Sequence, residues 1–298
     1  MNFNSGENWN TGHKYNKPTV FKEIDAPRNL VRYLEDASAR TKDHKYVYHY
    51  TTLHNLIKIL RGKYWHLANA KDMNDQLEYK HGDKSRWENI FFSSFMMDSK
   101  ESIGMWSMYA QPWESGVKIA IPTSELKKWV AASPKILGLK RNHTGGFEEI
   151  SDSLKIDGMN AVLALSAVAY SNVDSLETGE PEQLTWGQAK NLLIKNAPNI
   201  PELTGYIKDK AWDYEKELRL KITFASRQNI DRVAVELSDA LINSMTITAS
   251  PLFDGNLQEK IQAEIEQQVN TEKSIFTNRL FIRTICSDCE ARKHVVSA

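Results

Sequence analysis

The chain has 298 residues, and its 38 lysines and arginines balance its 38 aspartates and glutamates, which leaves a formal net charge of zero. This balance excludes the general basic excess by which many proteins bind nucleic acids or anionic membranes. A hydrophobic fraction of 41% with 26% charged residues is typical of a globular protein and excludes overall disorder.

The sequence also indicates a cellular compartment. The longest apolar stretch, residues 161–170, is far shorter than the roughly 20 residues that a membrane helix needs. The N-terminus lacks the apolar segment of a secretory signal. Cys286 and Cys289 are the only cysteines, too few for a disulfide framework, and a zinc site would have only His294 nearby as a third ligand. We therefore expect a cytoplasmic protein that binds neither a membrane nor a metal.

The order of predicted elements along the chain indicates the fold class. Residues 1–27 are expected to form a loose polar tail and residues 28–298 a single domain. Apolar residues at helical spacing predict helices at 30–39, 53–61, 99–110, 125–132, 184–196, 202–212 and 256–269. Alternating, β-branched or aromatic segments predict strands at 45–52, 64–69, 89–97, 116–122, 161–170, 214–224, 231–238, 244–250 and 279–285. Turn-forming residues predict loops at 71–82, 134–158 and 171–182. Strands and helices mixed in this way predict an α+β fold.

Four short clusters contain side chains that are suited to chemistry. They are His49-Tyr50-Thr51 on the first predicted strand, Asn74-Asp75-Gln76-Leu77-Glu78 after the second, Ser93-Ser94 with Trp106 and Tyr109, and Glu215-Lys216-Glu217 at the start of a late strand. A histidine at the end of a strand can donate a hydrogen bond to a ligand or accept one. A strand carboxylate beside an arginine or a lysine stays ionised and can stabilise a cationic transition state.

Each cluster also has a purely structural interpretation. For His49 it is a hydrogen-bonded position in the core or at its rim, and for Asn74-Asp75 it is a turn or a helix cap. For the aromatic pair on the predicted helix it is core packing. For the two glutamates of the last cluster it is a solvated, salt-bridged strand edge shared with Arg219 and Lys221.

Taken in order, the clusters resemble the motifs of the Domain of Unknown Function 2971 family of bacteria. The matching segments are YHYTT at 48–52, MNDQLE at 73–78, FFSSF at 91–95, MWSMYAQPWESGVKIAIP at 105–122 and WDYEKELRL at 212–220. Two positions differ from the family pattern. Gln76 stands in place of a proline, which loosens that turn, and Leu218 stands in place of an aromatic residue, which a strand face tolerates.

That family in turn resembles the ADP-ribosyltransferase fold, which implies a split, mixed or antiparallel sheet with surrounding helices. Transferases of the diphtheria-toxin and poly(ADP-ribose) polymerase type have a histidine on a strand, a tyrosine on a later helix and a glutamate on a strand. By this resemblance His49, Tyr109 and Glu217 match the three positions. Glu215 is similar to the first glutamate of the E-x-E motif of arginine-specific toxins. Either glutamate is therefore a candidate catalytic residue, and Glu217 is the favoured one.

The resemblance implies NAD as a substrate and no metal. Cleavage of the nicotinamide–ribose bond passes through an oxocarbenium-like sugar, whose charge an ionised Glu217 can stabilise. Tyr109 or Trp106 would stack on the nicotinamide, and His49 and Thr51 would bind the adenosine ribose. The predicted site consists of catalytic Glu217 and Glu215, with His49, Tyr50, Thr51, Ser94, Trp106 and Tyr109 as the NAD-binding residues.

The sequence therefore predicts an NAD-dependent, ADP-ribosyltransferase-like enzyme. By resemblance it is a toxin or an anti-phage defence effector that transfers ADP-ribose to an unidentified acceptor. Two alternatives stay open. One is an inactive module of the same fold that binds a nucleotide or a partner. The other is a metal-dependent hydrolase that uses Asp72, Asp75, Glu215 and Glu217. The charge balance does not indicate a nucleic-acid partner.

Overall fold

The computed structural model describes most of the chain between residues 44 and 279. The described residues are 44–73, 87–144, 146–149, 161–171, 205, 207–224, 229–266, 268–277 and 279. Several predictions lie outside them: the polar tail, the helices at 30–39 and 184–196, the Asn74–Glu78 box, the strand at 279–285 beyond its first residue, and both cysteines.

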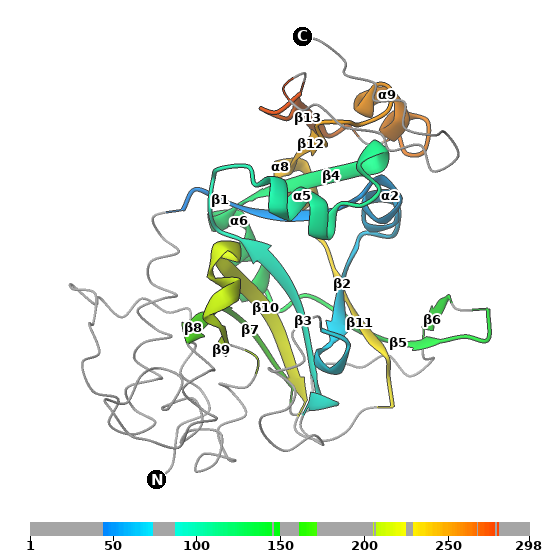
Figure 1. Ribbon diagram of the computed structural model, residues 1–298. Coiled ribbons are helices and arrows are strands. Elements are labelled where there is room, and N and C mark those ends of the chain that lie inside the picture. Colours follow the sequence, from blue (N-terminus) through cyan, green and yellow to red (C-terminus); the bar gives the residue numbers. More distant parts are fainter. Residues whose placement is uncertain are drawn as a thin grey trace, which may run out of the picture.

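Strands and helices are intermixed in the described chain, as predicted (Figure 1). The main sheet contains β1 (Tyr46–Thr52), β2 (Tyr64–Asn69), β3 (Ile90–Met96), β4 (Gly116–Pro122), β5 (Ile136–Arg141), β6 (Phe147–Glu149), β7 (Ala161–Ala167), β10 (Glu217–Phe224), β11 (Arg232–Glu236), β12 (Thr246–Ala249) and β13 (Asn270–Lys273). A separate parallel pair consists of β8 (Ala169–Ser171) and β9 (Ile207–Asp209). The helices are α2 (Leu53–Gly62), α5 (Ile103–Tyr109), α6 (Thr123–Ala131), α8 (Asp239–Ser244) and α9 (Leu257–Gln262). The described residues also form three 3-10 turns, η2 (Ala70–Asp72), η3 (Trp113–Ser115) and η5 (Lys210–Glu215).

The main sheet is split at β3. One edge of β3 pairs with β10 along its whole length. On the other edge, β1 pairs only through Tyr48 opposite Met96, and β2 pairs only through Ala68 and Asn69. In Figure 1, β1 and β4 therefore lie above the point where β2 and β11 diverge from β3. All pairs in this sheet are antiparallel except β12 with β13. The predicted α+β class with a split, mixed sheet and surrounding helices is confirmed.

The strand β10 pairs with β3 on one edge and with β7 on the other, and both of its faces are buried. Leu218, Leu220 and Ile222 alternate into the main hydrophobic core. Glu217 and Arg219 point to the other face, where they are 2% and 1% exposed. The prediction of two distinct faces is correct, but the interpretation of the charged face as a solvated edge is wrong. The charged face is buried because other segments cover it: Lys208 of β9 lies 3.5 Å from Glu217, and the Gly205 carbonyl accepts a hydrogen bond from Arg219.

Local sequence signals account for the elements that were predicted well. Thr52 ends β1 and caps α2, since its hydroxyl accepts a hydrogen bond from the Asn55 amide at 3.3 Å. Gly116 begins β4 where the chain returns beneath α5. A Cβ atom at this position would lie 2.5 Å from the carbonyl oxygen of Ala110, so only glycine fits. This close approach fixes α5 against the start of β4.

Several predicted elements differ from the structure. The loop at 134–158 contains β5 and β6, whose hairpin turn is closed by the Asn142 amide donating to the Gly146 carbonyl at 2.9 Å. The predicted strand 161–170 is interrupted at Val168, whose amide donates to the Glu217 carbonyl at 2.9 Å. The hairpin was not predicted because Gly145 and Gly146 indicated a loop. The interruption of the strand at Val168 was not predicted because it depends on a long-range contact with β10.

Three further differences concern helices. In place of the predicted helix at 202–212, the described residues form the strand β9 and the turn η5. The helix predicted at 256–269 ends at Gln262, and the chain then forms β13, while α8 was not predicted. Short apolar segments of this kind take their conformation from non-local pairing, as β9 does with β8. None of the described helices is long and apolar enough to cross a membrane.

Candidate active site

A cavity of about 200 Å³ opens where the sheet splits. Its walls come from β1, β3, η2, α5, β9, η5 and β10. Six of the eight predicted site residues line it: His49, Tyr50, Ser94, Tyr109, Glu215 and Glu217. Lys208, Arg219 and Asp72 line it as well. Residues that are far apart in the chain therefore meet at one cavity, in the strand, helix and strand order that the sequence predicted.

The two glutamates reach the cavity because the backbone turns sharply between them. Lys216 has a φ of 44°, in the left-handed region that residues with a side chain seldom adopt. Its amide donates to the Asp213 carbonyl at 3.2 Å, and its carbonyl accepts from the Met97 amide at 2.9 Å. These bonds hold the turn that connects η5 to β10. As a result Glu215 and Glu217 both face inwards, while Lys216 itself is exposed.

Glu217 is the most strongly coordinated carboxylate of the site. Its Oε1 accepts hydrogen bonds from the Ser94 hydroxyl and from Arg219 Nε, and its Oε2 accepts from Arg219 Nη2 at 3.1 Å. Lys208 Nζ lies 3.5 Å from the same Oε2. Burial alone would raise the pKa of Glu217, but the charges of Arg219 and Lys208 and the hydrogen bonds from Arg219 and Ser94 lower it overall. Glu217 is therefore a buried carboxylate that stays ionised.

Arg219 is fixed in turn by the residues around it. Its Nη1 donates to the Gly205 carbonyl at 2.5 Å, and its guanidinium lies 4.2 Å from the centre of the Phe92 ring. The register of β10 against β3 places Arg219 opposite Ser94, so Arg219 reaches Glu217 from two residues along the same strand and Ser94 reaches it from the neighbouring strand. A guanidinium held in this way supplies a fixed positive charge beside the carboxylate.

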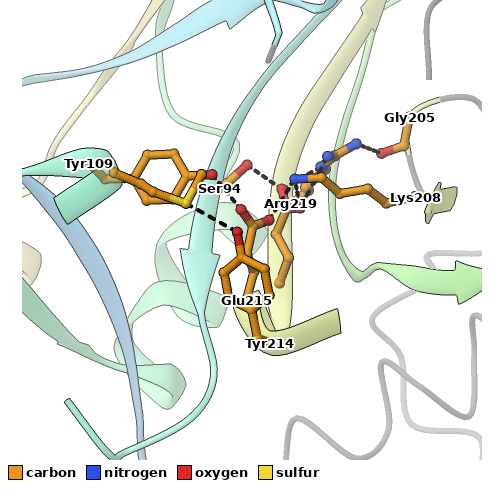
Figure 2. A network of polar contacts seen from close by, with 9 residues as sticks. Ser94, Tyr109, Gly205, Lys208, Tyr214, Glu215 and Arg219 are labelled. Atoms are coloured by element: carbon orange, nitrogen blue, oxygen red, sulfur yellow. Dashed lines mark hydrogen bonds and ion pairs between the residues drawn. The ribbon is translucent and has the colours of Figure 1, made fainter. Parts of the chain in front are cut away.

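Glu215 has a different set of partners. Figure 2 shows Tyr109 approaching its carboxylate from one side and Lys208 from the other. The Tyr109 hydroxyl donates to Oε1, and Lys208 Nζ lies 2.5 Å from Oε2. Burial raises the pKa of Tyr109, and the hydrogen bond to Glu215 and its negative charge raise it further. The phenol therefore stays protonated and acts as a donor.

His49 bridges the gap in the sheet. Its Nδ1 lies 2.9 Å from the Ser94 carbonyl, and its ring packs edge-on against Trp65 with the centroids 5.0 Å apart. A carbonyl oxygen only accepts, so Nδ1 must carry the proton, which leaves Nε2 as an acceptor in the neutral ring. Burial lowers the pKa of His49, which favours this neutral form. The structural and the functional interpretation thus apply together: His49 is hydrogen-bonded to β3 and lines the cavity.

Thr51 and Trp106 do not line the cavity, contrary to their predicted roles. The Thr51 hydroxyl accepts a hydrogen bond from the Asn55 side chain at 3.2 Å. Trp106 is fully buried, packs edge-on against Tyr50 and donates from Nε1 to Glu101 at 3.3 Å. Trp106 and Tyr109, three residues apart, lie on the same side of the short helix α5, and Trp106 is buried by its contacts with Tyr50 and Glu101. It anchors this helix and so positions Tyr109.

Lys208 is the charged residue of the network that the sequence did not reveal. It lies on β9, in a segment whose apolar spacing predicted a helix, and no motif includes it. Lys208 is buried, and its Nζ lies 4.5 Å from the centre of the Trp212 ring. Both features depend on the pairing of β8 with β9. Such long-range pairing leaves no local signal. Arg219, in contrast, was recognised as the charged neighbour of Glu217.

Three carboxylates and two cations line the cavity, and four of these five residues form one network. Two carboxylates and two cations, Glu215, Glu217, Lys208 and Arg219, form one buried network that lines the cavity. An ionised carboxylate in such a place can stabilise a positive charge that develops on a bound molecule. Among the residues that the structure describes, no group of three His, Cys, Asp or Glu side chains is arranged to hold a metal, and Asp75 lies outside them.

Comparison with known proteins extends these observations. Residues 105–220 match the family described as "Protein of unknown function (DUF2971)", which confirms the resemblance drawn from the motifs over that segment. No curated protein matches the sequence. Among solved structures, the chain is similar to Thermus sp. 2.9 DarT in complex with NAD+, with 11% identity, a TM-score of 0.33, and coverage of 80% of this chain and 98% of that one. It is also similar to Thermus sp. 2.9 DarT in complex with ADP-ribosylated ssDNA, with 13% identity, a TM-score of 0.34, and coverage of 80% and 97%.

Proposed function

We propose that the protein is an NAD-dependent ADP-ribosyltransferase whose catalytic residue is Glu217. One observation carries the proposal: a buried carboxylate lines a cavity and is kept ionised by Arg219, Lys208 and Ser94. Enzymes that cleave glycosidic bonds use a carboxylate of this kind to stabilise an oxocarbenium-like sugar. A purely structural ion pair does not require a cavity beside it.

The remaining walls fit one end of a dinucleotide. The cavity volume of about 200 Å³ is below the 300–1,000 Å³ of most ligand pockets, so it would hold the nicotinamide riboside part and leave the rest at the mouth. The Tyr109 ring supplies an aromatic surface for the nicotinamide. Nε2 of His49 supplies an acceptor for a ribose hydroxyl. Tyr50 and Ser94 complete the wall, and Ser94 also orients Glu217.

The proposed reaction uses charge rather than a metal. The nicotinamide of NAD is a cationic leaving group. When its bond to C1′ of the ribose breaks, the bonding electron pair moves to the ring nitrogen and nicotinamide departs neutral. The positive charge that appears on the ribose lies against ionised Glu217, in surroundings where little water screens it. Arg219 and Ser94 hold the carboxylate in place, so that no reorganisation is needed as the charge develops.

Nicotinamide release from NAD by purified protein tests the proposal. We expect release by the wild type that EDTA does not change and that Glu217→Gln reduces by roughly a hundredfold or more. Binding of NAD without release would instead support an inactive nucleotide-binding module. Hydrolysis of a substrate other than NAD that stops with EDTA would support a metal-dependent hydrolase, and either result would overturn the proposal. The toxin or anti-phage role is a further part of the proposal, which growth arrest on expression of the wild type but not of Glu217→Gln would support.

A further inference from the structure

We infer that Lys208 determines the acceptor class of this site. Because its ammonium forms an ion pair with the Glu215 carboxylate, the site rejects cationic acceptors and takes a neutral nucleophile. The inference rests on the proposed function, because an acceptor is needed only if ADP-ribose is transferred. Lys208 lies 2.5 Å from Glu215 and 3.5 Å from Glu217, and its side chain is 7% exposed. It is therefore an internal cation of the site rather than a surface residue.

Both oxygens of Glu215 already accept a hydrogen bond from the protein in this arrangement, and one of the two donors is a cation. Its Oε1 accepts from Tyr109 and its Oε2 accepts from Lys208. A free carboxylate two residues before the catalytic one would attract a guanidinium or an alkylammonium by charge and by paired hydrogen bonds. Here the same charge is already neutralised. A guanidinium that entered would have to displace Lys208 or remain buried as an uncompensated positive charge, and both are unfavourable.

Lys208 is also held in the position that blocks a cation. Its ammonium lies 4.5 Å from the centre of the Trp212 ring, whose face attracts a positive charge. The strand β9 that carries Lys208 is paired with β8. The ammonium is thus fixed by two carboxylates, by an aromatic ring and by its own strand. Displacement of Lys208 by a soluble guanidinium would break the contacts of its ammonium with the carboxylates and with the ring.

A neutral nucleophile meets none of these barriers. In the transfer step the C1′–N bond to nicotinamide breaks with its electron pair going to nicotinamide. A lone pair of an uncharged oxygen or nitrogen, from water, a hydroxyl or a heterocyclic base, forms the new bond to C1′. The nucleophile then loses its proton to solvent. The balance is NAD+ plus H–X giving ADP-ribosyl–X, nicotinamide and a proton, and no cation has to replace Lys208.

Agmatine, a small guanidinium compound, provides the probe. Wild type, Lys208→Met and the control Lys216→Met are incubated with NAD and agmatine, and the products are separated by chromatography with mass detection. Lys216 is exposed and adjacent to Glu215, so its variant removes the same charge without opening the site. We expect the wild type and Lys216→Met to form ADP-ribose and no agmatine adduct. Adduct formation by the wild type at a rate near that of hydrolysis would overturn the inference.

A binding measurement gives a second readout that does not depend on turnover. Titration calorimetry of agmatine without NAD should show at least tenfold tighter binding to Lys208→Met than to the wild type or Lys216→Met, because only the first variant removes the cation that is paired with Glu215. Equal affinity for all three proteins would overturn the inference even if NAD is cleaved. If NAD is not cleaved, the proposed function fails. The titration still decides whether the ion pair of Lys208 with Glu215 prevents a guanidinium from binding there. If Lys208→Met does not fold, Lys208→Gln takes its place, since an amide removes the charge and keeps a hydrogen-bond donor.

Discussion

Replacement of Glu217 by glutamine changes the charge of the site with the least change in shape. In the wild type this carboxylate accepts hydrogen bonds from Ser94 and Arg219 and lies 3.5 Å from Lys208. The variant retains one carbonyl oxygen as an acceptor, but its amide group turns a donor towards cations that are donors themselves. Lys208 and Arg219 are then left with Glu215 as the only carboxylate of the network.

The expected size of the effect follows from these contacts. Loss of a preorganised charge beside a developing cation costs about 3–4 kcal/mol of transition-state stabilisation. At 1.36 kcal/mol for each factor of ten, nicotinamide release should fall by roughly 150- to 900-fold. The binding constant for NAD should change little, because the interaction strengthens mainly in the transition state. Removing one partner of a buried ion pair also destabilises the fold, by about 3 kcal/mol where glutamine retains part of the hydrogen bonding.

The assay compares Glu217→Gln with the control Glu236→Gln, which removes a carboxylate from an exposed position on β11. Nicotinamide release is followed at a temperature where thermal unfolding shows both variants to be folded, and NAD affinity is measured by calorimetry. The control should keep wild-type activity and lie within about 0.5 kcal/mol of wild-type stability. If Glu217→Gln is folded and releases nicotinamide at the wild-type rate, Glu217 has no part in the chemistry and the reasoning from its ionisation is refuted.

Three other perturbations have distinct expected outcomes. Glu215→Gln should reduce nicotinamide release less than Glu217→Gln does and should alter the ratio of transfer to hydrolysis, so an equal loss in both variants would contradict the assignment of roles. His49→Asn places an amide donor where Nδ1 donates to the Ser94 carbonyl, so the melting temperature should fall by only about 2–4 °C, while loss of the Nε2 acceptor should weaken NAD binding roughly tenfold. Unchanged affinity would leave His49 with a structural role alone. The native pKa of Glu217 lies below its ordinary value, so its stabilisation is complete above about pH 4.3 and is lost as the pH falls through the native pKa. Acid titration of the unfolding free energy should therefore be shallower in Glu217→Gln than in the wild type, and parallel curves would refute the pKa shift.

Local patterns predicted most of the elements that carry the site. The alternation and aromatic content of 45–52 and 116–122 predicted β1 and β4, because both strands have a polar or glycine boundary that marks their ends. The resemblance to the transferase pattern of a strand histidine, a helix tyrosine and a strand glutamate brought His49, Tyr109 and Glu217 together in one hypothesis, and the structure places all three at one cavity.

The parts that could not be predicted depend on contacts between distant segments. Spacing on a helix could not decide which of Trp106 and Tyr109 faces the cavity, since α5 is short and both rings are surrounded by apolar residues. The burial of Glu215 and Glu217 could not be predicted either, because strand alternation gives the face of a residue but not what covers it. Lys208 depends on the pairing of β8 with β9, for which the sequence has no local pattern.

The position of β10 between β3 and β7 also constrains how the protein folds. Ser94 and Glu217 are 123 residues apart in the chain, and Tyr109 and Glu215 are 106 residues apart. Contacts of such long range slow folding, since a large loop must close before they contribute. A chain emerging from the ribosome exposes Tyr109 long before either glutamate has been synthesised. Carboxylates buried without their cations would be strongly unfavourable, so a partly assembled site has little stability of its own. The charged network therefore forms cooperatively and late, and incomplete chains lack it.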